Sequence, residues 1–180
     1  MKKSGFLISS IMIITLILFT GCGGKSNVDL PKISSKYNMG NINLRVQQFH
    51  EPEIKYHTKA ELNDMFKNGL VKKLDENNFI SDNSRDNVLT VGVSYQRRFL
   101  GDETPIKSDS LGAPRFTYSI EIRDKNNKTL RELIRTNQIY SGGFLFNLKI
   151  IAGQVKEKKY EKDFIEALVN KIYKDIENIK

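Results

Sequence analysis

The chain has 180 residues, of which 39% are hydrophobic and 28% charged, and its formal net charge is +8 at pH 7. This length fits a single domain, and a single cysteine excludes both a disulfide framework and a thiolate metal cluster. The basic excess favours anionic partners. A charged stretch at residues 156–162 mixes both signs, however, and we interpret it as the solvated start of a helix rather than a binding patch.

The N-terminal segment has the composition of an export signal. Two lysines follow the initiating methionine, a mainly apolar run extends over Phe6–Phe19, and the small residues Thr20 and Gly21 lead into Cys22. The apolar run is roughly 14 residues long, which is short of the about 20 that a membrane-spanning helix needs. We therefore expect residues 1–21 to be a signal peptide and not a transmembrane anchor.

The end of this segment resembles the lipobox of bacterial lipoproteins. Leu18, Thr20, Gly21 and Cys22 match that pattern, whereas Phe19 stands where an aliphatic residue is usual. The resemblance implies that the Cys22 thiol receives a diacylglyceryl group and that cleavage before Cys22 makes it the new N-terminus. Acylated Cys22 would then bind membrane lipid, and two or more acyl chains anchor a protein stably.

The same resemblance implies a location outside the cytoplasm. Gly23 follows the cysteine, in place of the aspartate that is associated with inner-membrane retention in enteric bacteria. In a bacterium with two membranes this favours the outer membrane, with the domain on the periplasmic face. In a bacterium with one membrane, the signal would leave the protein on the outer face of the plasma membrane.

A spacer and a strand follow the signal. Residues 22–41 are rich in Gly, Ser, Asn and Lys and have no apolar period, which predicts a lipidated cysteine and a flexible tether. A single folded domain is expected over residues 42–180. It begins with a strand, because Ile42, Leu44 and Val46 alternate with polar residues.

A helix is predicted next, from a capping box at Thr58–Glu61 to about Asn77. Gly69 lies inside it and lowers its helix propensity by up to about 1 kcal/mol relative to alanine, which indicates close packing. The apolar residues that recur at helical spacing are Leu62, Met65, Phe66, Leu70 and Leu74.

The middle of the chain has the two-residue period of strands. Leu89–Phe99 is predicted as one long strand, and residues 116–123 and 129–140 as a hairpin with its turn at residues 124–127. The segment Gly101–Arg115 is too rich in Gly, Pro, Asp and Ser for regular structure. A loop this long is either functional or a disordered connection, and the sequence leaves both open.

Apolar residues dominate the last part of the chain. Phe144–Ala152 follows a turn at Gly142 and Gly143, and we expect it in the core; the alternative is a partner or membrane contact. A strongly amphipathic helix is predicted over Phe164–Ile176. The order β-α-β-β-β-α predicts an α+β fold, a two-layer sandwich of two main helices on a mostly antiparallel sheet of about four strands.

No catalytic or metal-binding motif stands out. His50 and His57 flank Glu51 and Glu53, but their spacing matches no metal site. A nucleophile elbow, a Walker loop and a dinucleotide-binding glycine motif are all missing. We therefore expect no enzyme activity, cofactor, metal or nucleic-acid partner, and the sequence points to no small-molecule substrate.

Four stretches of the predicted domain resemble small proteobacterial lipoproteins of unassigned function. They are Tyr95–Pro105, Pro114–Ile120, Gly143–Lys149 and Phe164–Leu168. The resemblance implies an outer-membrane lipoprotein and no particular activity. The order of elements is also similar to that of auxiliary lipoproteins of envelope transport machines, including the one that plugs the lipopolysaccharide-export barrel, although a shared fold does not determine function.

The first functional hypothesis is a non-enzymatic accessory subunit of an outer-membrane or transport assembly. An uncovered sheet face and the Gly101–Arg115 loop would make the contact, with Gly101, Asp102, Glu103 and Arg115 as candidate partner-contact residues. Deleting the loop is then expected to leave the fold intact and to abolish the interaction.

The alternative hypothesis is a module that binds anionic envelope polymers or lipids, such as lipopolysaccharide or peptidoglycan. Arg97, Arg98, Lys107 and Arg115 would supply the positive charge. Binding would then weaken steeply with salt.

Overall fold

The computed structural model describes residues 33–179. The predicted signal peptide, residues 1–21, and the predicted lipidation site Cys22 lie outside these described residues. The helices and strands are β1 (Tyr37–Gln47), α2 (Lys59–Glu76), β2 (Asn87–Gln96), β3 (Arg115–Arg123), β4 (Thr129–Ile139), α3 (Phe144–Ile151) and α4 (Lys158–Asn178).

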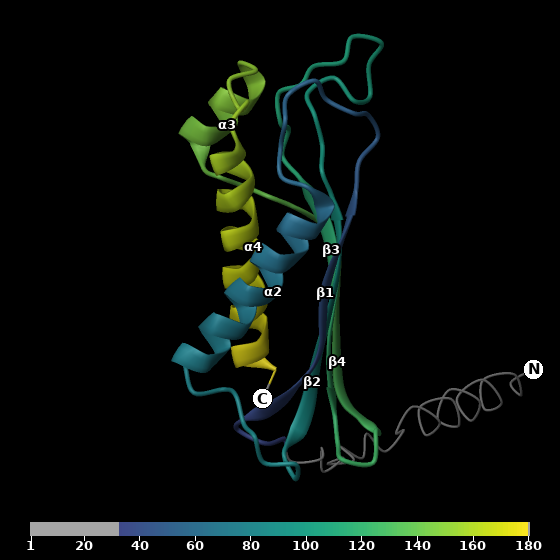
Figure 1. The fold of residues 1–180 in the computed structure, drawn as a ribbon, viewed down its shortest axis with the longest axis vertical. Coiled ribbons are helices and arrows are strands. Elements are labelled where there is room, and N and C mark those ends of the chain that lie inside the picture. Colours follow the sequence, from purple (N-terminus) through teal and green to yellow (C-terminus); the bar gives the residue numbers. More distant parts are fainter. Residues whose placement is uncertain (1–32, 180) are drawn as a thin grey trace, which may run out of the picture. The chain divides into compact units, whose positions relative to one another are not determined.

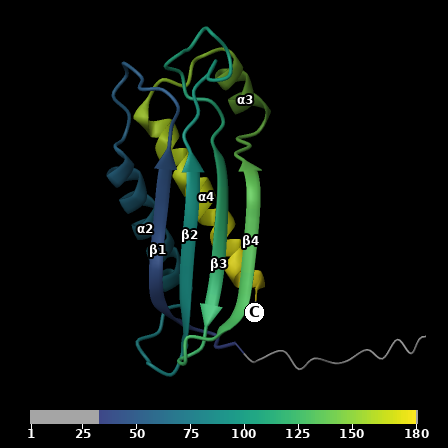
Figure 2. The ribbon, with the colours of Figure 1, turned by 90° about the vertical axis from the view of Figure 1, so that its right-hand side faces the viewer.

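The strands form one four-stranded sheet in the order β1-β2-β3-β4. β1 and β2 are parallel, with α2 as the crossover between them, and the pairs β2–β3 and β3–β4 are antiparallel. The helices lie on one side of the sheet, and its other side faces solvent (Figure 1 and Figure 2). The predicted α+β two-layer sandwich with a mostly antiparallel sheet is therefore confirmed.

The main core lies between the sheet and the helices α2 and α4. Every second residue of β3 is buried, as its two-residue period predicts. Burial of each large apolar side chain contributes about 1.5–3 kcal/mol, which holds the two helices on the sheet. The side chains with no solvent exposure include Tyr37, Leu62, Phe66, Leu70, Leu74, Leu89, Val91, Ile120, Ile122, Ile172 and Ile176.

β1 begins at Tyr37, so the prediction that residues 37–41 belong to the tether is wrong. Two asparagines and a glycine in this stretch are weak strand formers, and they hide the strand from a search for alternation. Parallel pairing with β2 stabilises it nevertheless, and Tyr37 is fully buried.

Two local predictions are confirmed. The Thr58 side chain accepts a hydrogen bond from the Glu61 N–H, and the Glu61 carboxylate accepts one from the Thr58 N–H, which completes the capping box of α2. In the β3–β4 hairpin, Asp124 Oδ1 accepts hydrogen bonds from the backbone of the turn residues, and Asn127 has a positive φ of 65°.

The prediction that Phe144–Ala152 belongs to the core is wrong. Residues 144–151 form α3, and none of its residues is buried. The reason is that α2 and α4 already cover the inner side of the sheet, so that α3 packs beside the first turns of α4, past the ends of the strands (Figure 2). Gly143, with φ 81°, allows the chain to turn from β4 into α3. Among the helices that the structure describes, none is long and apolar enough to cross a bilayer.

Candidate functional site

Three connections meet at one end of the domain, which we call the tip: residues 48–57, 97–114 and 140–157. β1, β2 and β4 end at the tip, and β3 begins there (Figure 2). Tyr37, where the sheet begins, lies at the opposite end. The tip is therefore built from loops that the sheet brings together from distant parts of the sequence.

The tip has a small hydrophobic core of its own. Phe146 of α3 and the neighbouring Tyr140 pack on it, with ring centroids 5.7 Å apart, and Tyr140 lies 4.8 Å from the ring of Phe164. A backbone hydrogen bond of 2.8 Å from Leu111 to Val155 joins two of the connections. The buried residues of this core are Tyr56, Phe99, Leu111, Val155 and Phe164.

A buried ion pair joins the tip to α4. Glu161 has no solvent exposure, and its carboxylate lies 2.7 Å from the guanidinium of Arg97, which is 5% exposed. Glu161 also accepts hydrogen bonds from the backbone N–H and from Nδ1 of His57, at 2.8 and 2.9 Å. Arg97 donates to the Gln48 side chain and to the His57 carbonyl. The prediction of a solvated helix start at residues 156–162 is therefore wrong for Glu161.

His50 joins the first connection to the second. Its Nδ1 lies 2.8 Å from Asp102 Oδ1, and its Nε2 lies 3.6 Å from Asp109 Oδ1. The imidazole packs against Phe99, with ring centroids 4.4 Å apart. The contact of Nδ1 with Asp102 is within hydrogen-bond distance, so that His50 fastens the two connections to each other through this nitrogen.

The Tyr56 hydroxyl makes a further link within the tip. It donates a hydrogen bond of 2.6 Å to the Asp109 carbonyl. Burial and the nearby carboxylates of Glu161 and Asp109 raise the pKa of Tyr56 to about 12, against the opposing charge of Arg97. The hydroxyl therefore remains a protonated donor at neutral pH.

The predicted loop Gly101–Arg115 is folded onto the tip, and Arg115 is already the first residue of β3. Gly101 has φ 84°, and a Cβ there would lie 2.1 Å from the Ile106 carbonyl oxygen, so that no other residue fits. Asp102 accepts a hydrogen bond from the Phe99 N–H in addition to its contact with His50. Gly101 and Asp102, two of the candidate partner contacts, thus stabilise the conformation of the loop through contacts inside the domain.

Most of the basic residues considered for polymer binding are engaged within the protein. Arg97 is buried, and the guanidinium groups of Arg98 and Arg115 lie 2.8 and 3.8 Å from the Glu103 carboxylate. Lys107 is exposed. Glu103 and Arg115, the other two candidate partner contacts, therefore lie together at the surface, where one carboxylate faces two guanidinium groups.

Large apolar side chains are exposed mainly at the tip. Exposed patches of this kind mark interaction sites. A hollow of about 400 Å³ lies between the end of β4 and α3, with the exposed side chains of Ile139 and Ile151 among its lining residues. Of the eight exposed large hydrophobic residues in the described part of the chain, six belong to the tip: Phe49, Ile106, Phe144, Leu145, Leu148 and Ile151.

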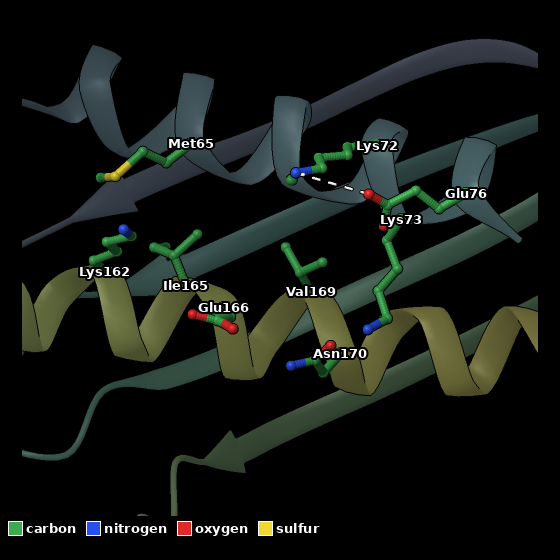
Figure 3. A pocket seen from close by; sticks show the side chains of 10 residues that line it. Met65, Lys72, Lys73, Glu76, Lys162, Ile165, Glu166, Val169 and Asn170 are labelled. Carbon is green, nitrogen blue, oxygen red and sulfur yellow. Dashed lines mark ion pairs between the residues drawn. The ribbon is translucent and has the colours of Figure 1, made fainter.

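A hollow of about 360 Å³ lies between α2 and α4 (Figure 3). Its lining includes the apolar side chains of Met65, Ile165 and Val169, together with three lysines and two glutamates. Lys72 and Glu76 form an ion pair of 3.7 Å within this lining. Because the lining carries both lysines and glutamates, it favours neither an anionic nor a cationic ligand. We interpret the hollow as the ordinary surface groove between two packed helices.

A smaller hollow, of about 260 Å³, opens beside His57. A histidine whose Nδ1 faces a carboxylate is held in one tautomer, as in the general bases of hydrolytic sites. None of the described residues that line this hollow is a serine or a cysteine that could act as the nucleophile. Within residues 33–179, no group of three His, Cys, Asp or Glu is arranged to hold a metal ion.

The sequence does not reveal the Arg97–Glu161 pair, because nothing in it connects an arginine after one strand with a glutamate in the last helix. For Phe144–Ala152 the apolar pattern favours the core, and exposure to a partner or membrane is only the alternative; the structure leaves the outer face of α3 exposed.

No family model matches the chain, and no curated protein is similar to it in sequence. Among solved structures, rare lipoprotein B from Shewanella oneidensis is similar over 78% of this chain and 95% of that one, with 11% identity and a TM-score of 0.34. A DUF330-family protein from Xanthomonas campestris is similar over 82% and 97%, with 12% identity and a TM-score of 0.29. Likenesses this weak establish neither family nor function.

Proposed function

We propose that this protein is a lipid-anchored envelope lipoprotein, held on the periplasmic face of the outer membrane by acylated Cys22, that docks through its tip onto an envelope protein assembly. It is an accessory subunit and not an enzyme. The observation that carries the proposal is the gathering of six exposed large apolar side chains at the tip. The lipobox-like end of the signal segment supplies the anchor.

The distribution of charge favours this function over the binding of anionic polymers. Of the four basic residues considered for polymer binding, Arg97 is paired in the interior, and Arg98 and Arg115 share the Glu103 carboxylate. An electrostatic site needs uncompensated charge on one face. The tip instead presents apolar side chains, which suit a protein interface.

The anchor is tested by metabolic labelling of the full chain with a radioactive fatty acid. The label is expected on the unaltered protein and not on Cys22→Ala, which should also leave the membrane fraction. Equal labelling of the two proteins would contradict the lipid anchor at Cys22.

Docking is tested by purifying the tagged full chain from detergent-solubilised membranes and identifying co-purified proteins by mass spectrometry. A stoichiometric partner is expected, and it should be lost in the tip variant that combines Phe49→Ser, Ile106→Ser, Phe144→Ser and Leu145→Ser, all at exposed positions. Ile134→Ser serves as the control, since Ile134 is 55% exposed on β4, outside the tip. Recovery of the protein alone, with salt-sensitive binding to lipopolysaccharide or peptidoglycan, would favour the alternative function.

A further inference from the structure

α3 presents two apolar faces, of which the tip uses only one. Phe146 and Ile150 pack inward, and the Phe146 ring lies 5.7 Å from the rings of Tyr160 and Phe164. The outward residues are Phe144, Leu145, Leu148 and Ile151, with exposed fractions of 76, 74, 44 and 73%. The inner face of α3 is thus held against the core of the tip. Its outer face has no partner among the described residues.

The outer face has the spacing of a helix that binds in a groove. Phe144, Leu148 and Ile151 stand at positions i, i+4 and i+7, which share one side of a helix. Amphipathic helices that dock into hydrophobic grooves present their anchors at these positions. Because α3 is already folded, binding would cost little ordering entropy.

We propose that α3 is a preformed recognition helix, and that its outer face binds in an apolar groove with an acidic rim on a partner protein. This inference rests on the proposed docking function and assigns the contact to one element of the tip. It replaces the Gly101–Arg115 loop and the open sheet face as the principal contact.

The positive charge around α3 is the reason to expect an acidic rim on the partner's groove. The segment from Tyr140 to Lys156 contains no aspartate or glutamate, and it carries Lys149 in the last turn of α3 as well as Lys156. Carboxylates around the partner's groove would therefore be attracted by these two lysines, and no acidic residue of this segment would repel them.

The length of chain before the domain argues for a protein and against the anchoring bilayer as the occupant. About 15 residues separate Cys22 from Tyr37. The sequence predicts a flexible tether there, and a tether of that length would span about 20 Å on average. β4 alone has 11 residues, or about 37 Å at the usual strand rise. α3 lies beyond the far end of the strands from Tyr37 (Figure 2), farther from Tyr37 than such a tether would span on average, which favours a protein over the anchoring bilayer as the occupant.

The test is site-specific photo-crosslinking of the full chain in living cells. A photoreactive residue is placed at Leu148 in α3, at Ile106 in the loop, and at Ser94, which is exposed on the open face of the sheet. The position in α3 is expected to give one crosslinked protein. Mass spectrometry of that product should place the crosslink among apolar residues of the partner, with aspartate or glutamate beside them.

Two surface variants test the chemistry of the contact. Leu145→Asp, at a position that is 74% exposed, should abolish the crosslink from Leu148. Lys149→Glu should reduce it roughly tenfold, the effect of losing one complementary charge of moderate strength. Ile134→Asp on β4 is the matched control and should leave it unchanged, and circular dichroism checks that each variant is folded.

The remaining outcomes separate this inference from the proposed function. A protein crosslink from Ile106 or Ser94 but not from Leu148 would overturn the role of α3 and leave docking in place. A crosslink from Leu148 to phospholipid, or to a second copy of this chain, would also overturn it. The absence of protein crosslinks from all three positions would refute both proposals.

Discussion

The carboxylate of Glu161 is completely buried between the guanidinium of Arg97 and two N–H groups of His57. Removing one partner of such a pair leaves an uncompensated charge and typically costs about 3–5 kcal/mol. We expect Arg97→Met to lower the free energy of unfolding by about this amount, measured by urea denaturation. The double variant Arg97→Met with Glu161→Leu should lose less than Arg97→Met alone, and an equal or larger loss would contradict this account of the pair.

Asp175 predicts a pH dependence of stability. Burial acts to raise the pKa of Asp175, but the hydrogen bond from the Tyr118 hydroxyl and the charge of Arg135 outweigh it, so that the pKa is lowered. A lowered pKa in the folded state contributes stability above the unfolded pKa of about 4, and this contribution is lost as the pH falls through the folded value.

The measurement is the difference in unfolding free energy between the unaltered protein and Asp175→Asn. We expect this difference to shrink as the pH falls from 7 to 3, because a protonated aspartic acid resembles the amide. A difference that is the same at both pH values would show that Asp175 does not stabilise the fold through its charge.

Residues that act locally could be predicted from the sequence, and residues that act through distant partners could not. Thr58 and Glu61 stand three positions apart, so the capping box is visible in the chain itself. Glu161 is 64 positions from Arg97. The residues near Glu161 in the sequence include both lysines and other acidic residues. Nothing in that stretch distinguishes Glu161 as the glutamate that α4 buries.

Gly69 in α2 offers a stabilising substitution at the scale of the element. A Cβ at Gly69 would meet Val169 Cγ2 of α4 at 3.4 Å, an ordinary contact. Gly69→Ala should therefore raise the free energy of unfolding by about 0.5–1 kcal/mol through helix propensity. Gly40→Ala is the contrasting control, since a Cβ there would lie 2.6 Å from Thr90 Oγ1 and should destabilise the protein. Destabilisation by Gly69→Ala would show that α2 and α4 need the glycine to approach each other.

Elements with one buried face were predictable, and α3 was not. β3 alternates without interruption, and α4 buries one stripe of apolar residues, so that period alone identifies each of them. α3 is apolar on both its faces because one packs on the tip and the other faces solvent. A pattern without a polar side predicts burial, and this prediction fails for α3 because its outer face is exposed.

At the scale of the whole molecule, the prediction that deleting Gly101–Arg115 leaves the fold intact needs correction. Leu111 is 1% exposed in the small core of the tip, and its backbone is hydrogen-bonded to Val155. Removing the whole segment should therefore unfold the tip. A shorter deletion within the exposed residues 103–107 should preserve the fold.

Circular dichroism and urea denaturation of the two deletions distinguish these expectations. The long deletion should lose several kcal/mol, the usual cost of removing a large side chain from a core. The short one should change the free energy of unfolding by less than about 1 kcal/mol. Equal stability of the two proteins would mean that the tip core contributes little.

The location of the tip could not be predicted from the sequence, although each of its three connections contains a feature that the sequence singles out. The residues around His50 match no metal site, the loop after Gly101 is a candidate partner contact, and Phe144–Ala152 is an apolar run, and nothing in the sequence joins the three. Only the strand order places them together, because β1 and β2 are parallel neighbours that end at the same edge. The third connection, which contains α3, joins them through its aromatic contacts with α4.

α4 contributes to both hydrophobic cores: Phe164 to the core of the tip, and Ile172 and Ile176 to the main one. A chain that lacks Lys158–Asn178 would therefore leave part of the inner side of its sheet uncovered and Arg97 without its carboxylate. Stable folding is therefore expected only once α4 is available. If the chain is exported as proposed, this requirement would favour a polypeptide that is still unfolded while it passes through a translocation channel.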